Sequence, residues 1–190
     1  MIMKTNTRKL VLNSLLLAIG LLLHQITPTI GLPIQPDMTL IMLFTIIILN
    51  KDDYKISLVC GVITGIFTAL TTKFPGGQLP NILDKVITTN LIYALVFIMY
   101  KFPFIKKFKE KTQDFIISLI ILPIGTLVSG TTFLLSALIL VGLPGTFKSL
   151  FLVAVVPAVL INLVCGLFLI KVVSISVKRI GYKDLKSISK

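Results

Sequence analysis

Two long apolar runs of the chain are joined by the polar segment Phe74-Pro75-Gly76-Gly77-Gln78-Leu79-Pro80-Asn81-Ile82-Leu83-Asp84-Lys85. Its prolines and glycines interrupt regular helix, so they divide the two runs into separate helices. A simple turn would not need the two amides or the adjacent acid and base that the segment also contains. These polar side chains predict that the segment has a function beyond connecting two helices.

The composition of the whole chain is that of a membrane protein. Of its 190 residues, 55% are hydrophobic and only 14% are charged, and the mean hydropathy is +1.01. Soluble domains carry about 25% charged residues. At about 20 apolar residues per spanning helix, the chain has room for five or six spans but not for a soluble domain as well. We therefore expect one transmembrane domain over residues 1–190.

The apolar runs predict an all-α polytopic bundle of six transmembrane helices, at about residues 8–29, 38–49, 56–72, 81–100, 114–141 and 149–175. The second is short, because even with Asp37 it covers roughly 20 Å of a hydrocarbon core of about 30 Å. We expect Asp37 to begin it at membrane depth and to cap it. A cleaved signal peptide is the alternative for the first run, but no small-residue cleavage site follows His24.

The lysines and arginines predict the orientation of the bundle. The net charge is +12, and sixteen of the 19 basic residues lie in the two tails and in the loops after the second and fourth helices. The other three are Lys73, Lys85 and Lys148. Positively charged loops stay in the cytoplasm, so both termini should be cytoplasmic and the segment from Phe74 to Lys85 external. Membrane topology therefore accounts for the positive net charge, and binding to nucleic acid is not needed to explain it.

Candidate binding residues gather near the external ends of the helices. Asp37, Asp84 and Lys85 are charged groups at membrane depth, where a charge needs a partner. Lys85 could bind a carboxylate while one of the acids binds an ammonium, which describes a site for a zwitterion. Further candidates are the donors and acceptors Gln78, Asn81 and His24, the backbone amides of Gly76 and Gly77, and the aromatic ring of Phe74.

Structural roles remain alternatives for several of these residues. Asp84 and Lys85 can pair with each other or with helix dipoles, and a lone histidine such as His24 is often a hydrogen-bonded structural residue. The polar patch Ser129-Gly130-Thr131-Thr132 can join helices or line a cavity. Cys60 and Cys165 lie in apolar runs without a CxxC or Cys/His partner, so we expect them to be core residues rather than metal ligands.

The sequence contains no motif of a common membrane enzyme. It has no HExxH or GxSxG motif, and the turn at 141–149 lacks the glycine that precedes the lysine of a phosphate loop. We therefore expect no catalytic residues, no metal and no cofactor on this chain. Small residues instead predict helix contacts, because Ser14 and Ala18 share one face of the first helix and Gly61 and Gly65 form a GxxxG pair.

The sequence resembles the tryptophan transport protein family. The resemblance rests on Gln35-Pro36-Asp37-Met38 and on the segment from Thr64 to Lys85, and it covers nearly the whole chain, including His24 and the proline-rich turn after it. It implies a multi-pass protein of the bacterial cell membrane that acts as the tryptophan-binding S component of an energy-coupling factor transporter. Phe74, Tyr93 and Phe133 are candidates for the walls around an indole ring.

The resemblance also implies partners. A transmembrane coupling subunit and two cytoplasmic ATPases would supply the energy from ATP. Ser14 and Ala18 would contact the coupling subunit, although the family's usual motif has alanine where Ser14 stands. Alternatives are an S component for a vitamin or its precursor, a stand-alone proton-coupled amino-acid carrier centred on His24 and the acids, and a membrane scaffold that transports nothing.

Overall fold

The computed structural model describes residues 2–27 and 37–179, and these residues form helices and short connections without a strand. Five long apolar stretches could each cross a membrane, and they lie in α1 (Ile2–Ile26), α3 (Tyr54–Thr71), α4 (Gln78–Lys101), α6 (Glu110–Leu140) and the run from α7 to α8. The shorter apolar helix α2 (Met38–Leu49) lies between the first two of these. The predicted all-α polytopic bundle is confirmed.

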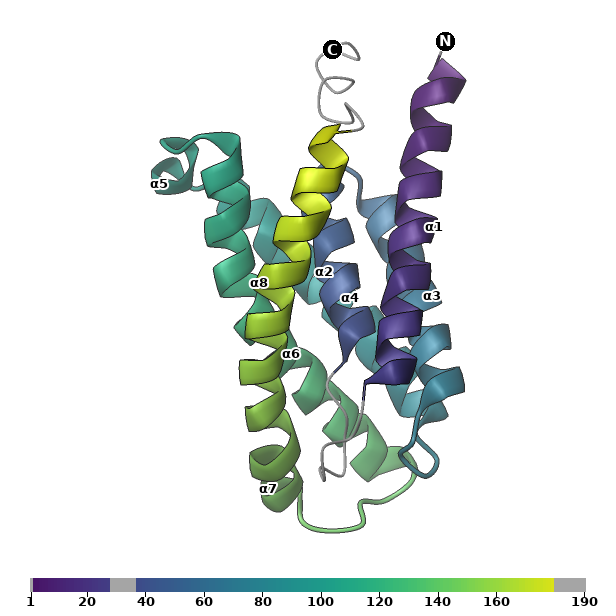
Figure 1. Cartoon of the computed structure of the whole chain (residues 1–190). Helices are drawn as coiled ribbons and strands as arrows, with labels where there is room; N and C mark the ends of the chain where they lie inside the picture. Colours follow the sequence, from purple (N-terminus) through teal and green to yellow (C-terminus); the bar gives the residue numbers. More distant parts are fainter. Residues whose placement is uncertain (1, 28–36, 180–190) are drawn as a thin grey trace.

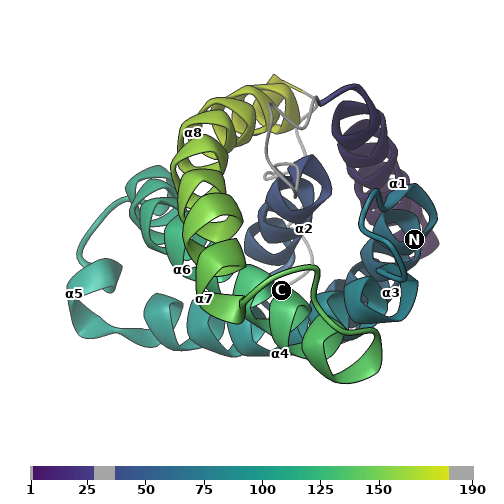
Figure 2. The same ribbon diagram turned by 90° about the horizontal axis from the view of Figure 1, so that it is seen from below.

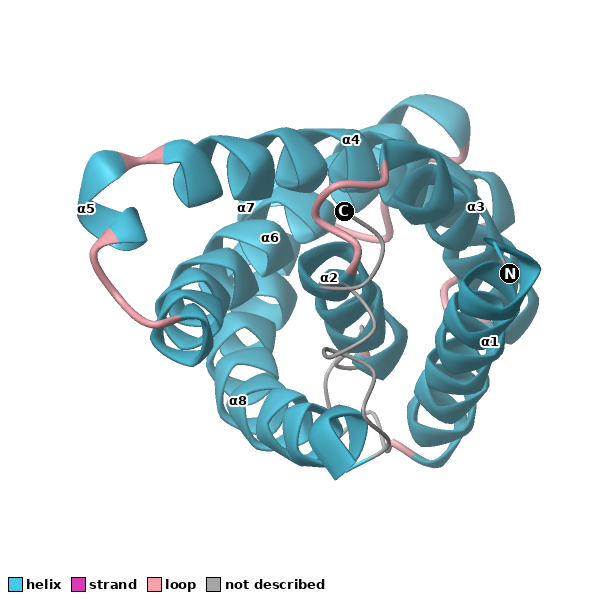
Figure 3. Cartoon of the chain, turned by 90° about the horizontal axis from the view of Figure 1, so that it is seen from above, coloured by secondary structure: helices cyan, strands magenta, loops and turns pink. Residues whose placement is uncertain are grey.

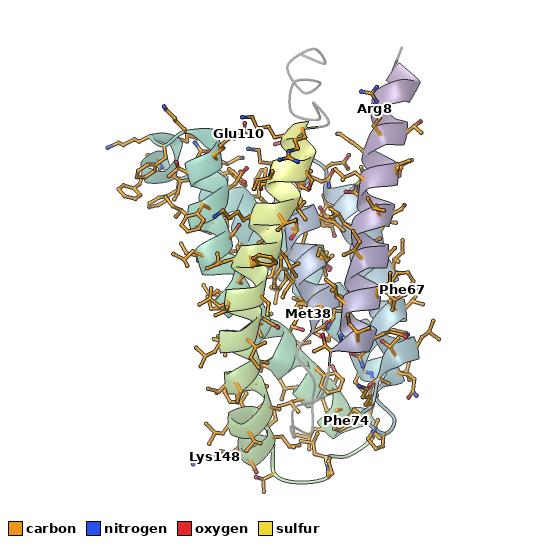
Figure 4. All side chains as sticks on the ribbon, viewed as in Figure 1. Arg8, Met38, Phe67, Phe74, Glu110 and Lys148 are labelled. Carbon is orange, nitrogen blue, oxygen red and sulfur yellow. The ribbon has the colours of Figure 1, made fainter. Side chains whose placement is uncertain are left out.

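Both ends of the described chain lie at the same end of the bundle. Figure 1 shows the beginning of α1 and the end of α8 together, beside the short helix α5 (Pro103–Lys106). Arg8 and Glu110 are at this end, whereas Phe74 and Lys148 are at the opposite end (Figure 4). This arrangement agrees with an even number of crossings, and the lysine distribution predicts that the end with Arg8 is cytoplasmic.

Helix α2 forms the centre of the bundle. Viewed along the bundle axis, it is surrounded by α1, α3, α4, α6 and α8 (Figures 2 and 3). Its residues from Met38 to Ile48 are all buried, as expected for a helix that is apolar on every side. The ring of Phe44 fills the space that a side chain at Gly125 of α6 would occupy. Met38 lies part-way along the bundle, so α2 begins inside it (Figure 4).

The predicted small face of α3 packs against α4. The side chain of Thr89 occupies the space where Gly61 would place a Cβ atom, and the Cα atom of Ile82 would lie 3.1 Å from a Cβ atom at Gly65. Small residues allow two helix backbones to approach closely. The close approach at Gly65 also brings Lys85 of α4 to the interior.

The helix that follows the polar segment begins earlier than expected. Helix α4 starts at Gln78 instead of about residue 81, and Gly77 is its N-cap. Pro80 is tolerated because a residue in the first turn has no intrahelical partner for its N–H. The polar segment is therefore a short turn followed by two helical turns, and these two turns carry Asn81, Asp84 and Lys85.

The final helix is interrupted near its start. It consists of α7 (Phe147–Leu150), the π-helical turn η1 (Phe151–Val155) and α8 (Val156–Arg179). Thr146 caps α7 by accepting a hydrogen bond from the Ser149 N–H at 3.2 Å. Pro157 has no N–H to continue the regular ladder, and the π turn ends two residues before it. Turns of this kind occur often at functional sites.

Candidate functional site

The ammonium group of Lys85 is buried between two carboxylates. Its Nζ atom lies 2.8 Å from Asp37 Oδ2 and also donates a hydrogen bond to Asp84 Oδ2, and the lysine is only 2% exposed. Asp84 is 1% exposed. The pairing of Asp84 with Lys85 that the sequence suggested as a structural alternative therefore forms. It lies inside the bundle and includes Asp37 from a second helix.

Each carboxylate is held in place by further hydrogen bonds. Asp37 caps α2 as expected, since its Oδ1 atom accepts hydrogen bonds from Leu40 N at 3.1 Å and from Thr39 Oγ1 at 2.5 Å. Asp84 accepts hydrogen bonds from Thr88 Oγ1 at 2.9 Å and from Ser129 Oγ at 2.8 Å. Side chains from α2, α4 and α6 thus meet at a single point.

His24, near the end of α1, completes this charged cluster. Its Nδ1 atom lies 3.5 Å from Asp37 Oδ1, and the residue is 6% exposed. Two carboxylates share the one ammonium of Lys85 here. Charges inside a membrane are costly unless they are paired. The second carboxylate therefore favours a cationic group of a ligand beside it.

The cluster forms part of the wall of a cavity of about 740 Å³, its open mouth included. The polar part of the lining comprises His24, Asp37, Thr68, Thr72, Lys73, Asn81, Asp84, Lys85, Thr126, Ser129 and Asn162. The rest is formed by Leu40, Phe74, Gly130, Phe133, Ala154, Val155 and Ala158.

Two aromatic rings line the cavity beside the charged cluster. Phe74 and Phe133 are in edge-to-face contact, with ring centroids 5.4 Å apart and an interplanar angle of 85°. They pack with Leu134, Leu150 and Val155 in a small apolar core of their own. Phe74 lies at the end of the bundle opposite Arg8 (Figure 4). The cavity therefore combines a charged part with an aromatic part.

Tyr93 does not share this cavity, contrary to its selection as a candidate wall residue. Its hydroxyl group donates a hydrogen bond of 3.1 Å to the carbonyl of Lys51, in the turn between α2 and α3. Its ring contacts those of Tyr54 and Phe97. Tyr93 thus belongs to the opposite end of α4 from the cavity.

The predicted site residues divide into two groups. His24, Asp37, Phe74, Asn81, Asp84 and Lys85 all line the one cavity. Gln78, Gly76 and Gly77 are outside the lining, and Gln78 is exposed. Gly76 has a φ angle of +69°, which favours glycine, so it supports the turn before α4. Asn81 also contacts this turn, because its Nδ2 atom donates a hydrogen bond to the Gly77 carbonyl at 2.8 Å.

The cavity also contains polar residues that sequence reasoning did not select. Thr126 of α6 and Asn162 of α8 are buried in its wall and lie within hydrogen-bond distance of each other. The sequence left open whether the polar patch at residues 129–132 joins helices or lines a cavity. Ser129 of this patch does both, because it lines the cavity and its hydrogen bonds link α6 to α4. The only feature of the sequence that could have marked Asn162 as a site residue is that its amide lies within an otherwise apolar run.

Ser14 and Ala18, the predicted contacts with a partner, are exposed side by side on the outer face of α1. The neighbouring Leu16 and Leu17 point into the bundle and are buried. Both small residues therefore lie on the surface of this chain.

Comparison with known proteins gives one consistent family. The family model described as "Tryptophan transporter TrpP" matches residues 6–178. A probable tryptophan transport protein of Clostridium perfringens is 50% identical over 176 residues, which cover 93% of this chain and 96% of that protein. The protein of the same description from Bacillus subtilis is 38% identical over 178 residues, covering 94% and 97%. No solved structure is significantly similar to the chain.

Proposed function

This chain belongs to the tryptophan transporter family, and we propose that it captures tryptophan at the external face of the bacterial cell membrane, as the substrate-binding subunit of an energy-coupling factor importer. The observation that carries the proposal is the cavity in which Asp37, Asp84 and Lys85 meet beside Phe74 and Phe133. An aromatic amino acid needs this combination of charges and rings.

The charged cluster supplies both charges that a zwitterion requires. The ammonium of Lys85 binds the ligand carboxylate. The ligand ammonium binds a carboxylate of the cluster, either Asp37 or Asp84, whose contact with Lys85 is then weaker. Charge-assisted hydrogen bonds of this type are among the strongest in proteins. Asp37 is the better candidate for the second role, because its side chain is 18% exposed whereas that of Asp84 is 1% exposed.

The aromatic part of the cavity suits the side chain of tryptophan. Phe74 and Phe133 already meet edge to face, and an indole ring can join them in offset or edge-to-face contact. Such contacts contribute roughly 0.5–1.5 kcal/mol per pair beyond the burial of apolar area. This favours an aromatic amino acid over a small one.

The energy for transport comes from partner subunits in this proposal. The sequence has no intact nucleotide-binding motif, so ATP would be hydrolysed by two cytoplasmic ATPases attached to a transmembrane coupling subunit. The exposed small face with Ser14 and Ala18 is the surface on which that coupling subunit would pack. Lysine-rich loops on the predicted cytoplasmic side are consistent with this orientation.

A direct binding measurement tests the proposal. The chain contains no tryptophan, so in purified protein the ligand is the only indole fluorophore and its emission should shift to shorter wavelength on burial. Saturable binding of tryptophan, with weak or no competition by vitamins, supports the proposal. If the protein binds a vitamin or its precursor and does not bind tryptophan, the proposed ligand is wrong but the proposed class of transporter still holds.

The contact between His24 and Asp37 favours one alternative, a stand-alone proton-coupled carrier. His24 lies 3.5 Å from the Asp37 carboxylate, and histidine is the residue type most often used to transfer protons. Uptake by vesicles that contain this chain, a proton gradient and no cassette ATPase would support the carrier. Uptake that requires the coupling subunit and ATP would support the importer.

A further inference from the structure

Asn162 is a buried polar residue in the cavity wall to which the charged cluster assigns no role. It lies on α8 and is 1% exposed. Its Nδ2 atom donates a hydrogen bond of 3.2 Å to Thr126 Oγ1 of α6. Its Oδ1 atom is buried and has no hydrogen-bond partner among the residues that the structure describes.

The hydrogen bonds of Thr126 fix which way the Asn162 amide faces. A threonine hydroxyl has one proton to donate, and Thr126 donates it to the Leu122 carbonyl at 2.8 Å. Thr126 Oγ1 can therefore only accept from Asn162, which places the amide nitrogen on that side. The opposite atom, Oδ1, is the acceptor that lacks a donor, and buried polar groups in proteins are nearly always satisfied.

Two small residues line the cavity before this acceptor. Ala154 lies in η1 and Ala158 in α8, eight and four residues before Asn162, and all three line the cavity. Gly130 of α6 also lines the cavity, and Val155 of η1 packs against it where a Cβ atom would lie. The two alanines and Val155 give this part of the wall an apolar surface, which suits the face of a flat ring.

We propose that Asn162 Oδ1 accepts the hydrogen bond of the indole N–H and so makes the site selective for that donor. This inference rests on the proposed function. The ligand ammonium is served by Asp37 and the ligand carboxylate by Lys85, so the indole N–H is the donor of tryptophan that still needs a partner. Thr126, which holds Asn162, precedes Ser129 by about one turn, roughly 4.5 Å along α6. Ser129 contacts Asp84, so Asn162 and the charged cluster are joined to neighbouring turns of the same helix.

A comparison of two ligands tests the assignment. In 3-benzothienylalanine a sulfur atom replaces the indole N–H, while the charged groups and the ring shape remain. Calorimetric titration of the wild-type protein should show preference for tryptophan by on the order of tenfold. The near-isosteric Asn162→Leu variant should bind the two ligands within about twofold of each other. Thr126→Val, which releases the Asn162 amide, should reduce the preference without abolishing it.

Asn13→Leu is the matched control, because Asn13 is also a buried helical asparagine but lies outside the cavity, where it accepts a hydrogen bond from Asn50. It should keep the full preference. Equal binding of both ligands by the wild type, or an equal loss for both in the Asn162 variant, would overturn the assignment. Equal binding by the wild type overturns the assignment even where a variant fails to fold. Absence of tryptophan binding in the wild type would instead refute the proposed function itself.

Discussion

Lys85 Nζ on α4 lies 2.8 Å from Asp37 Oδ2 at the start of α2. This ion pair connects the central helix of the bundle to the helix that follows the polar turn. It also joins the two parts of the sequence that carry the family resemblance. The residues that hold the fold together at this point are thus the same residues that we propose for binding, and substitutions must be chosen to separate the two roles.

Asp37→Asn should weaken tryptophan binding by roughly 10- to 100-fold, because it removes the charge opposite the ligand ammonium. Asparagine caps helices about as well as aspartate, so α2 should remain intact. Fluorescence titration of the purified variant measures the affinity, and circular dichroism checks the helix content. Unchanged affinity with an intact fold would exclude Asp37 from the site.

Lys85→Met should lower stability as well as binding, because it leaves two buried carboxylates without their cation. Breaking a buried ion pair in this way costs about 3–5 kcal/mol. The double variant Lys85→Met/Asp84→Asn should regain much of the stability but not the binding. Unfolding in mixed detergent compares the stabilities, and a double variant as unstable as the single one would contradict this account.

Gly61→Ala should destabilise the bundle by about 1–3 kcal/mol, because the new methyl group meets Thr89 of α4. Gly145→Ala is the matched control, since nothing lies within 4 Å of the added atom. The same unfolding assay should detect a loss only for Gly61. Equal stabilities of the two variants would show that α3 and α4 can separate without cost.

Ser14→Leu combined with Ala18→Leu should abolish co-purification with the coupling subunit and leave tryptophan affinity unchanged. Both side chains are exposed, so the larger residues disturb an approaching helix but not the fold. Ser174→Leu, at an exposed position of α8, is the control. An intact complex in the Ser14 and Ala18 double variant would place the contact elsewhere.

Local signals in the sequence predict much of this molecule. Apolar length predicted the six helices, and Asp37 was correctly predicted to cap the short run that follows it. The central position of that run in the bundle was not predicted. The small residues Gly61 and Gly65 predicted close packing of α3. These features depend on neighbouring residues or on helix periodicity, so a single chain contains enough information to find them.

The composition of the cavity was less predictable, because it depends on which helices become neighbours. Periodicity places Thr126 and Ser129 on one face of α6, but it does not show that this face meets α4 and α8. For the same reason the sequence could not show that Tyr93, one of three candidates for the cavity wall, lies away from the cavity although it shares α4 with Lys85. Gln78 was expected in a binding loop, and it instead begins α4 because the first turn of a helix accepts Pro80.

The short central helix has a consequence for the distance that a captured molecule still has to travel. Helix α2 has 12 residues and extends for about 18 Å, against a hydrocarbon core of about 30 Å. If the cytoplasmic end of α2 marks one edge of that core, a molecule held at Asp37 already lies about 12 Å below the other edge. More than a third of the insulating layer is then crossed by diffusion alone, before any conformational change begins.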